Sequence, residues 1–301
     1  MLRLLARLLF LLGLLCVAAP AHAELAVVTT TPDLAAIAAA VSGPRAKVRS
    51  LALPTQDPHA VDPRPNLALE LSRADLLLAV GAELELGWLP TLQIGSRNPR
   101  IQRGERGFLD CSELVDLIER PATKVDRSNG DVHPSGNPHY LLDPRAAERV
   151  AVGIGKRLAE LDPPGRAEYL ENTKRFVNAL REARKAWEAK LATARGREVI
   201  TFHRSLGYLA DWLGLVVVDY VEPKPGIAPN PRHVAALIQR GKQRGVRLVL
   251  QEAFYPSNTS ELVAQRIGAR FVKLPGATNH PAGQSYIAFL DEIVKRLAST
   301  P

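Results

Sequence analysis

One stretch near the middle of this 301-residue chain limits the available folds most strongly. Residues 165–194 have no Gly or Pro in their interior and are rich in Ala, Glu, Lys and Arg. Apolar residues recur in it at spacings of three, four and seven, which marks one face of an α-helix: Tyr169, Phe176, Leu180, Ala183, Trp187 and Leu191. Roughly 28 helical residues would extend about 42 Å. We expect a strut over residues 163–195 that joins two lobes; a long surface helix is the alternative.

Short apolar runs alternate with helical patterns on both sides of this stretch. Strands are expected at residues 25–31, 47–53, 75–81, 198–203, 215–221, 246–252 and 269–275. Helices are expected at residues 32–41, 67–74, 205–213, 231–244, 258–268 and 284–297, and from residue 144 onward. Uninterrupted apolar strands separated by helices are typical of parallel sheets covered on both faces. The sequence therefore predicts an α/β fold with two lobes, residues 24–162 and 196–301, with mainly parallel sheets flanked by helices and joined by one long rigid helix.

The N-terminus has the pattern of a secretory signal peptide. Two arginines precede an apolar run at residues 8–19, and Ala21 and Ala23 supply the small residues before a cleavage site. The run falls short of the ~20 apolar residues that span a bilayer. A lipid anchor on Cys16 is disfavoured because the residue before it is a leucine. We therefore expect residues 1–23 to be removed and the protein to reside in the periplasm.

Charge and cysteine content argue against two further classes of protein. The net charge is +8, but the basic residues are scattered, which indicates a solvated surface rather than a nucleic-acid site. Removal of the signal peptide leaves Cys111 as the only cysteine, so no internal disulfide is expected. Because Cys111 begins an apolar pattern that we expect to be helical, a buried, unreactive thiol is favoured over a reactive one.

Three histidines occupy similar places in this predicted fold. His59 follows the second strand by a short Pro-rich loop, His139 lies just ahead of a helix, and His203 ends a strand. In open α/β sheets, the carboxyl ends of the strands form the crevice where ligands bind. Neutral imidazole is the commonest protein ligand for zinc, and three such nitrogens with one oxygen complete a tetrahedral shell. The pattern favours a metal site, with polar loop residues as the alternative.

The residues around these histidines agree with that interpretation. A proline precedes both His59 and His139 and restricts each loop. Asp57, Asp62 and Asp143 are close enough in sequence to orient an imidazole N–H. Asp143 also stands directly before a proline, as a helix N-cap does, and we expect capping to be its main role.

Three other histidines are weaker candidates. His133 lies in a Gly- and Ser-rich loop that could carry metal toward a site, and His280 lies in a loop near the expected crevice. His233 is expected to be an exposed residue in the first turn of a helix.

Four fragments carry a resemblance to a known family: "QDPHAVDP" from residue 56, "GNPHYLLDP" from 136, "TFHRSLGYLADWLGL" from 201 and "VEPKPGI" from 221. In this combination the chain resembles the solute-binding proteins of zinc/manganese ABC importers over essentially its whole mature length. The resemblance implies two α/β lobes joined by a long helix, with metal in the cleft between them. It implies His59 and His139 as ligands from the N-terminal lobe and His203 from the C-terminal lobe. Histidine at the third position resembles the zinc branch, which agrees with the preference of zinc for imidazole and of manganese for carboxylate.

The sequence departs from the family at the fourth ligand. The family commonly supplies a carboxylate just after the last strand, where this chain has Leu274 and Pro275. The possible substitutes are Glu252, His280 and water. We expect Glu252, because it ends a strand at the predicted crevice; capping of the next helix is its alternative role.

These observations predict a periplasmic protein that captures Zn²⁺ between its lobes and delivers it to the permease of an ABC importer in the inner membrane. Mn²⁺ is the less favoured metal, nucleic acid is not an expected partner, and a monomer without enzymatic activity is expected. One alternative is a secreted zinc hydrolase that uses the same histidines with Glu252 as general base, although no His-Glu-x-x-His motif is present. Another is an iron-chelate or haem receptor, which shares the long-helix architecture.

Overall fold

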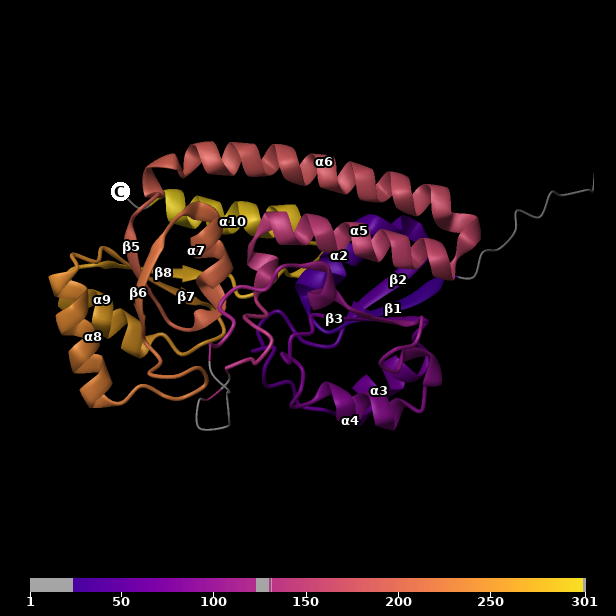
Figure 1. The fold of residues 1–301 in the computed structure, drawn as a ribbon, viewed down its shortest axis with the longest axis horizontal. Coiled ribbons are helices and arrows are strands. Elements are labelled where there is room, and N and C mark those ends of the chain that lie inside the picture. The colour runs from indigo at the N-terminus through magenta and orange to yellow at the C-terminus, as the bar shows by residue number, and fades with distance from the viewer. Residues whose placement is uncertain (1–23, 123–129, 131, 300–301) are drawn as a thin grey trace, which may run out of the picture.

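The computed structural model describes residues 24–122, 130 and 132–299. The predicted signal peptide, residues 1–23, lies outside the described residues. The described chain forms two four-stranded sheets, in the orders β2-β1-β3-β4 and β6-β5-β7-β8, and every strand pair in them is parallel. Figure 1 shows the sheets side by side, with one long helix above both. The predicted α/β fold class is therefore confirmed.

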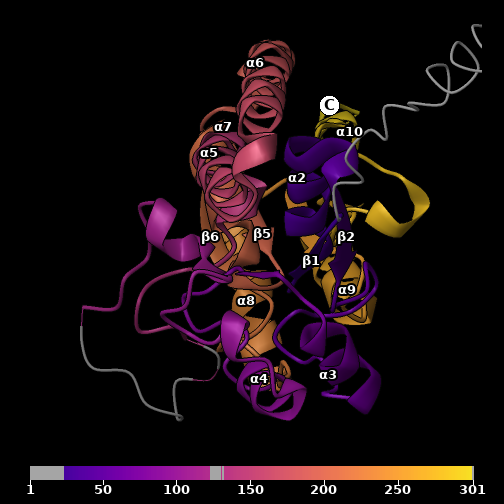
Figure 2. The same ribbon diagram turned by 90° about the vertical axis from the view of Figure 1, so that its right-hand side faces the viewer.

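The first sheet is built from the N-terminal part of the chain. Its strands are β1 (Leu25–Thr29), β2 (Ala46–Ser50), β3 (Leu76–Ala79) and β4 (Phe108–Asp110). Its helices are α2 (Pro32–Ser42), α3 (Pro65–Ser72), α4 (Leu89–Ser96) and α5 (Pro144–Leu161). Leu76 and Leu78 pack in one apolar cluster with α2 and α5, whereas Leu77 packs in another with α3 and α4 (Figure 2). The sheet is thus covered on both faces, because alternate side chains of a strand point to opposite sides.

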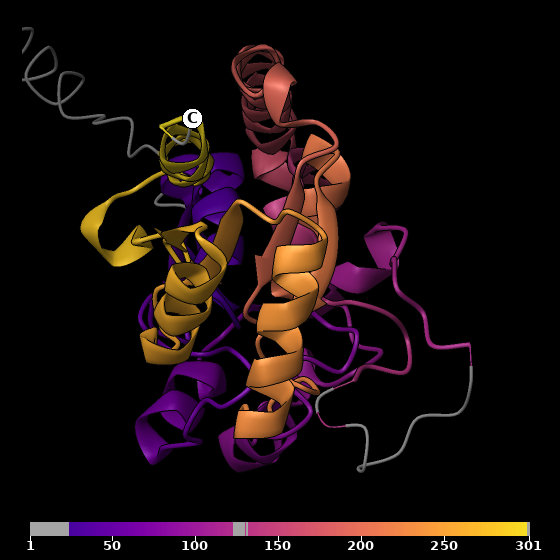
Figure 3. The ribbon, with the colours of Figure 1, turned by 90° about the vertical axis from the view of Figure 1, so that its left-hand side faces the viewer.

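The second sheet repeats this arrangement with the C-terminal part of the chain. Its strands are β5 (Glu198–Thr201), β6 (Val216–Tyr220), β7 (Leu248–Glu252) and β8 (Arg270–Leu274). Its helices are α7 (Gly207–Leu213), α8 (Pro231–Gln243), α9 (Asn258–Ile267) and α10 (Tyr286–Ala298). Figure 3 shows α8 and α9 side by side on the outer side of the molecule, and their apolar residues pack with Ile200 and Val249. On the other face, Leu250 packs with residues of α7 and α10.

The long helix is α6 (Arg166–Lys190), which has 25 residues and is therefore about 38 Å long. Its buried apolar residues follow the predicted periodicity and include Phe176, Leu180 and Trp187. It packs against α5 and α2 at one end and against α10 at the other, so it joins the two sheets as expected. Within the described residues, no helix is both long enough and apolar enough to cross a membrane.

Three short elements differ from the prediction. Strand β4 has only three residues, and α4 contains both Pro and Gly, so neither has a strong apolar period. The helix expected after Cys111 is wrong: only a 3-10 helix, Cys111–Leu114, forms there, and Val115 is already extended. The Asp110 side chain accepts a hydrogen bond from Ser112 N, which favours a tight turn at this position. Cys111 is fully buried, as predicted.

Candidate metal site

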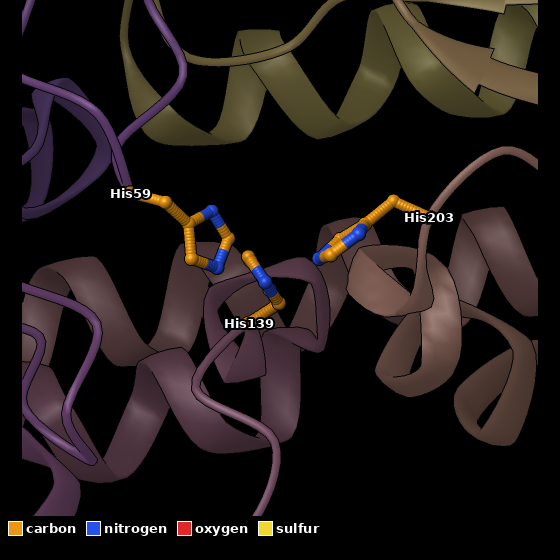
Figure 4. Close-up of side chains that lie close together, drawn as sticks. All are labelled: His59, His139 and His203. Carbon is orange, nitrogen blue, oxygen red and sulfur yellow. The ribbon is translucent and has the colours of Figure 1, made fainter. Parts of the chain in front are cut away.

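The structure brings His59, His139 and His203 together between the two sheets. His59 lies in the loop after β2, His139 directly precedes the 3-10 helix Tyr140–Leu142 that leads into α5, and His203 follows β5. One ring nitrogen from each lies within 4.8 Å of the other two. The ring centroids are 5.0, 5.2 and 5.5 Å apart, and the rings point toward one another (Figure 4). Residues from distant parts of the chain thus present three imidazoles to one point.

Local hydrogen bonds set the direction of the first two rings. His59 N donates to Asp57 Oδ1 at 2.9 Å, and Trp88 Nε1 donates to the carbonyl of Pro58 at 2.9 Å. His139 N donates to Asn137 Oδ1 at 2.9 Å, which forms the same kind of turn. Both histidines therefore follow a proline in an Asx turn, which fixes the loop that presents the ring.

The other aspartates near these histidines have ordinary roles. Asp143 caps α5 by accepting a hydrogen bond from Arg145 N at 2.7 Å, so the expected capping role is confirmed. Asp62 is exposed to solvent. Of the three aspartates considered from the sequence, Asp57 is the one that contacts an imidazole.

Two carboxylates hold the rings of His59 and His203. Asp57 Oδ1 lies 2.8 Å from His59 Nδ1, and Glu222 Oε2 lies 2.7 Å from His203 Nδ1. An ionised carboxylate only accepts hydrogen bonds, so in each pair the Nδ1 carries the proton and Nε2 is left with its lone pair toward the cluster. The sequence analysis missed Glu222. It lies two residues after β6, the neighbour of β5, so the strand-end argument used for His203 applied to it as well.

The surroundings of the site raise the pKa of one histidine and lower the pKa of another. Burial by itself lowers the pKa of His203, but the hydrogen bond and the charge of Glu222 outweigh it and raise that pKa above its usual value. Burial and the neighbouring imidazoles hold the pKa of His139 well below its usual value. Burial also raises the pKa of Asp57, but its hydrogen bond with His59 reverses this and leaves it lowered. His139 is therefore neutral at pH 7, and Asp57 is ionised.

A fourth histidine, His133, lies beside the cluster. Its Nε2 is 3.3 Å from His59 Nε2, and the two rings are stacked with centroids 5.4 Å apart. Burial and the proximity of His59 and His203 lower the pKa of His133 to about 3, so its ring is neutral at pH 7. From the sequence, it was only a weak candidate, because a Gly- and Ser-rich loop carries no periodic pattern that fixes its position.

Glu252, the carboxylate expected as fourth ligand, is buried. Its Oε1 accepts a hydrogen bond from Ser205 Oγ, whereas its Oε2 is buried without a partner. Both Glu252 and His139 line a cavity of about 60 Å³. Burial raises the pKa of Glu252, although Ser205 and His203 act against this.

The remaining histidines lie elsewhere. His280 lies near the backbone of Val48 in β2, and His233 Nε2 lies 3.0 Å from the carbonyl of Tyr220. Neither of them, nor His133, belongs to the group of three histidines whose ligand atoms all lie within 4.8 Å of one another, among the residues that the structure describes.

Comparison with known proteins agrees with this geometry. A family model described as "Zinc-uptake complex component A periplasmic" matches residues 27–300. The high-affinity zinc uptake system protein ZnuA of Bacillus subtilis is 25% identical over 71% of this chain and 66% of that protein. The ZnuA of Yersinia pestis is 25% identical over 92% of this chain and 91% of that protein. The chain thus spans just under two thirds of the first relative and nearly all of the second.

A solved structure supports the fold independently. A crystal structure of ZnuA has a TM-score of 0.78 with this chain at 24% identity, covering 92% of this chain and 99% of that one. At this identity the likeness shows a shared fold of two sheets and a long helix, and it leaves the ligands to be argued from this chain's own residues.

Proposed function

Because the chain belongs to the family of periplasmic components A of zinc-uptake complexes, we propose that it captures Zn²⁺ between its two sheets and delivers it to the permease of an ABC importer. The observation that carries this proposal is the cluster of His59, His139 and His203, whose ligand atoms lie within 4.8 Å of one another. Around a tetrahedral zinc, with Zn–N bonds of 2.0–2.1 Å, such atoms are about 3.3–3.4 Å apart. A small inward movement of the rings is therefore enough to bind the ion.

The donor set favours zinc over manganese. Imidazole nitrogen is a good ligand for zinc, whereas manganese prefers carboxylate and water oxygen. The carboxylates of Asp57 and Glu222 bond to the far nitrogens of His59 and His203, so they orient the ligands rather than replace them. The family and its relatives are uptake and binding proteins, so the chain is a carrier and not an enzyme.

We propose His133 for the fourth position. Its Nε2 lies 3.3 Å from His59 Nε2, which is the separation of two nitrogens on one tetrahedral zinc. Glu252, expected from the sequence, is the alternative, because its Oε2 is buried without a partner beside His139. His280 is a poorer candidate, because it lies near the backbone of Val48 in β2 and, within the described residues, makes no contact with the three histidines.

Zinc titration of the chelator-stripped protein tests the three-histidine site. Replacement of His59, His139 or His203 with Gln should weaken zinc binding by 100-fold or more, since each removes a ligand. His233→Gln and His280→Gln are matched controls outside the cluster and should bind as the parent does. Parent-like binding by the variants at His59 and His203 would refute the site, and hydrolytic turnover of ester or peptide substrates by the zinc-loaded protein would instead favour the hydrolase.

The fourth ligand is tested by a pair of variants. Absorption spectra of the Co²⁺-loaded protein report the number and type of donor atoms. If His133 is the ligand, His133→Gln changes the cobalt spectrum and weakens zinc binding about tenfold or more, whereas Glu252→Gln leaves the spectrum unchanged. The opposite pattern would assign the position to Glu252, and no change in either variant would assign it to water.

We also propose the export and assembly of the chain. The family is periplasmic, and we propose that residues 1–23 are cleaved during export. The mature chain would act as a monomer with lobes at residues 24–162 and 196–301, joined through residues 163–195. N-terminal sequencing of the periplasmic protein and light scattering with and without zinc test these statements. An intact N-terminus at residue 1 would contradict the first, and a stable dimer would contradict the second.

A further inference from the structure

The segment that carries His139 is bonded to both parts of the chain. Within the N-terminal part, the hydroxyl of Tyr140 donates to the carbonyl of Val80 and Asn137 N donates to the carbonyl of Ile118. The hydroxyl of Tyr208, in α7, donates to the carbonyl of Asn137 at 2.9 Å. The hydroxyl of Tyr286, in α10, donates to the carbonyl of Leu141 at 2.7 Å and is buried. His139 precedes α5 in sequence, yet its neighbours on both sides are therefore held by helices of the second sheet.

Asn137 connects the two metal-ligand segments directly. Its Nδ2 donates to the carbonyl of Arg204, the residue after His203, at 2.9 Å. Its Oδ1 accepts from His139 N at 2.9 Å, so one amide side chain contacts the backbone of both segments. Tyr208 adds a second connection through the bond from its hydroxyl to the carbonyl of Asn137. The same oxygen accepts a hydrogen bond from Ile118 N at 3.1 Å. The separation of His139 and His203 is thus set by bonds between protein groups.

The apolar core reinforces this connection. The largest buried cluster includes Leu78 of β3, Tyr140, Leu209 of α7, Leu250 of β7 and Tyr286. A movement that separated the two sheets near His139 would expose part of this cluster, at about 25 cal/mol for each Å² of apolar surface. Opening of the site between His139 and His203 is therefore costly.

The loop that carries His59 is held differently. Residues 51–64, between β2 and α3, contain no helix or strand. The backbone at His59 is held by hydrogen bonds within its own sheet region, from His59 N to Asp57 and from Trp88 to the carbonyl of Pro58, and its ring contacts His133. Across the site, Asp57 lies near Tyr255, in the segment after β7; burial raises the pKa of that tyrosine, and the charge of Asp57 helps to raise it. This loop can move without breaking the contacts that fix His139 to His203.

We propose that Asn137 and Tyr208 are positioning residues that fix His139 and His203 relative to each other before the metal arrives. Zinc then binds to this preset pair first, and the loop of His59 closes over it last. Release to a permease would reverse this order, beginning with movement of the His59 loop. The inference rests on the proposed zinc-carrier function and adds to it the order in which the ligands engage.

Hydrogen exchange of the full mature chain, with and without zinc, tests this order. Amides of residues 55–62 should exchange at least tenfold more slowly when zinc is bound. Amides of residues 139–142 and 204–209 should already be slow without zinc and should change less than twofold. Slowing of both regions by a similar factor would overturn the proposal, because His139 and His203 would then also be ordered by the metal.

Tyr208→Phe tests the positioning role itself. It removes the hydroxyl that bonds to Asn137 but keeps the ring in its packed place. We expect zinc affinity to fall about five- to twentyfold, and residues 139–142 to become fast-exchanging without zinc and slow with it. Tyr169→Phe is the matched control: it removes a hydroxyl bonded to Asp162 in the α5–α6 region and should change neither quantity. Parent-like affinity and exchange in Tyr208→Phe would refute the role.

Single-ligand variants separate this inference from the proposed function. If the preset pair binds first, His59→Gln should retain zinc at least tenfold more tightly than His139→Gln or His203→Gln. Equal losses in all three variants, together with zinc-dependent ordering at His139, would overturn the order while leaving the site intact. If none of the three variants weakened binding, the zinc site itself would be wrong.

Discussion

The contact between Glu222 and His203 gives the sharpest test of how the site obtains its affinity. Glu222→Gln keeps the size of the side chain, and an amide oxygen placed at Oε2 can still accept from His203 Nδ1 and from Gly226 N. The substitution therefore removes the negative charge while leaving the ring in place. A loss of zinc affinity then measures what the charge contributes, because the geometry of the ligand is preserved.

The expected magnitude follows from burial. Loss of a group that bonds to a metal-binding histidine typically weakens the metal site by about 10- to 100-fold, or about 1.4–2.7 kcal/mol. The side chains of His203 and Glu222 are only 4% and 8% exposed, so water screens their interaction little. Those of His59 and Asp57 are 10% and 30% exposed. We therefore expect a loss near 100-fold for Glu222→Gln and nearer tenfold for Asp57→Asn.

Competition with a chromogenic zinc chelator measures both losses, and thermal unfolding of the zinc-free proteins controls for damage to the fold. The effect should also depend on pH. Glu222 raises the pKa of His203, so in the parent protein protons compete with zinc as the pH falls through that raised pKa. Without the charge the pKa falls, so the loss of binding on acidification begins at a lower pH.

Two results would refute this reasoning. One is zinc affinity within threefold of the parent at pH 8 in Glu222→Gln, with zinc-free stability unchanged. The other is a larger loss in Asp57→Asn than in Glu222→Gln, since burial would then not determine the contribution of each carboxylate.

Three further predictions concern the scaffold. Asp33→Asn keeps an oxygen that accepts the hydrogen bond from Thr278 but removes a buried carboxyl group. Burial raises the pKa of that carboxyl group to about 6. Because a raised carboxyl pKa lowers stability as the pH rises from about 4 to 6, urea unfolding of the zinc-free variant should show a gain of about 3 kcal/mol at pH 7 and little at pH 4. Gly155→Ala places a methyl group against a threonine hydroxyl where α5 meets α6. This should lower the free energy of unfolding by about 1–3 kcal/mol and so lower the melting temperature. Gly95→Ala, whose added methyl group makes only an ordinary contact, should not lower it. Burial raises the pKa of the fully buried Cys111 thiol well above its usual value, so a thiol reagent should label it only as fast as the protein unfolds; rapid labelling of the native chain would contradict this.

Much of the fold followed from local pattern. The apolar runs that became β1, β3, β5 and β7 are continuous because these strands lie inside parallel sheets covered on both faces. The length and apolar face of α6 were also visible in the sequence, since one side of the helix packs against α5, α2 and α10, the helices that cover the two sheets. In contrast, β4 and α4 are short and depend on tertiary contacts, so no window of sequence identified them.

The candidate site was only partly visible from the sequence. Strand ends led to His203 and Glu252, because β5 and β7 are neighbours and end at the same edge. The same argument, applied to β6, would have led to Glu222. The proximity of His133 to His59 could not be found this way, since the two belong to loops 74 residues apart whose paths are set by the folded chain.

Charge balance favours a divalent cation in the proposed site, although this chain has Leu274 and Pro275 where the resemblance implies a carboxylate ligand. Leu274, one of the two residues at the position of that ligand, is fully buried in the apolar core. The three imidazoles are neutral when they bind metal, so the two positive charges of zinc need compensation nearby in a buried site. Asp57 supplies one negative charge from beside the first sheet, and Glu222 supplies another from beside the second. Under the proposed order of binding, full compensation is reached only when the His59 loop brings Asp57 against the pair held by Asn137 and Tyr208.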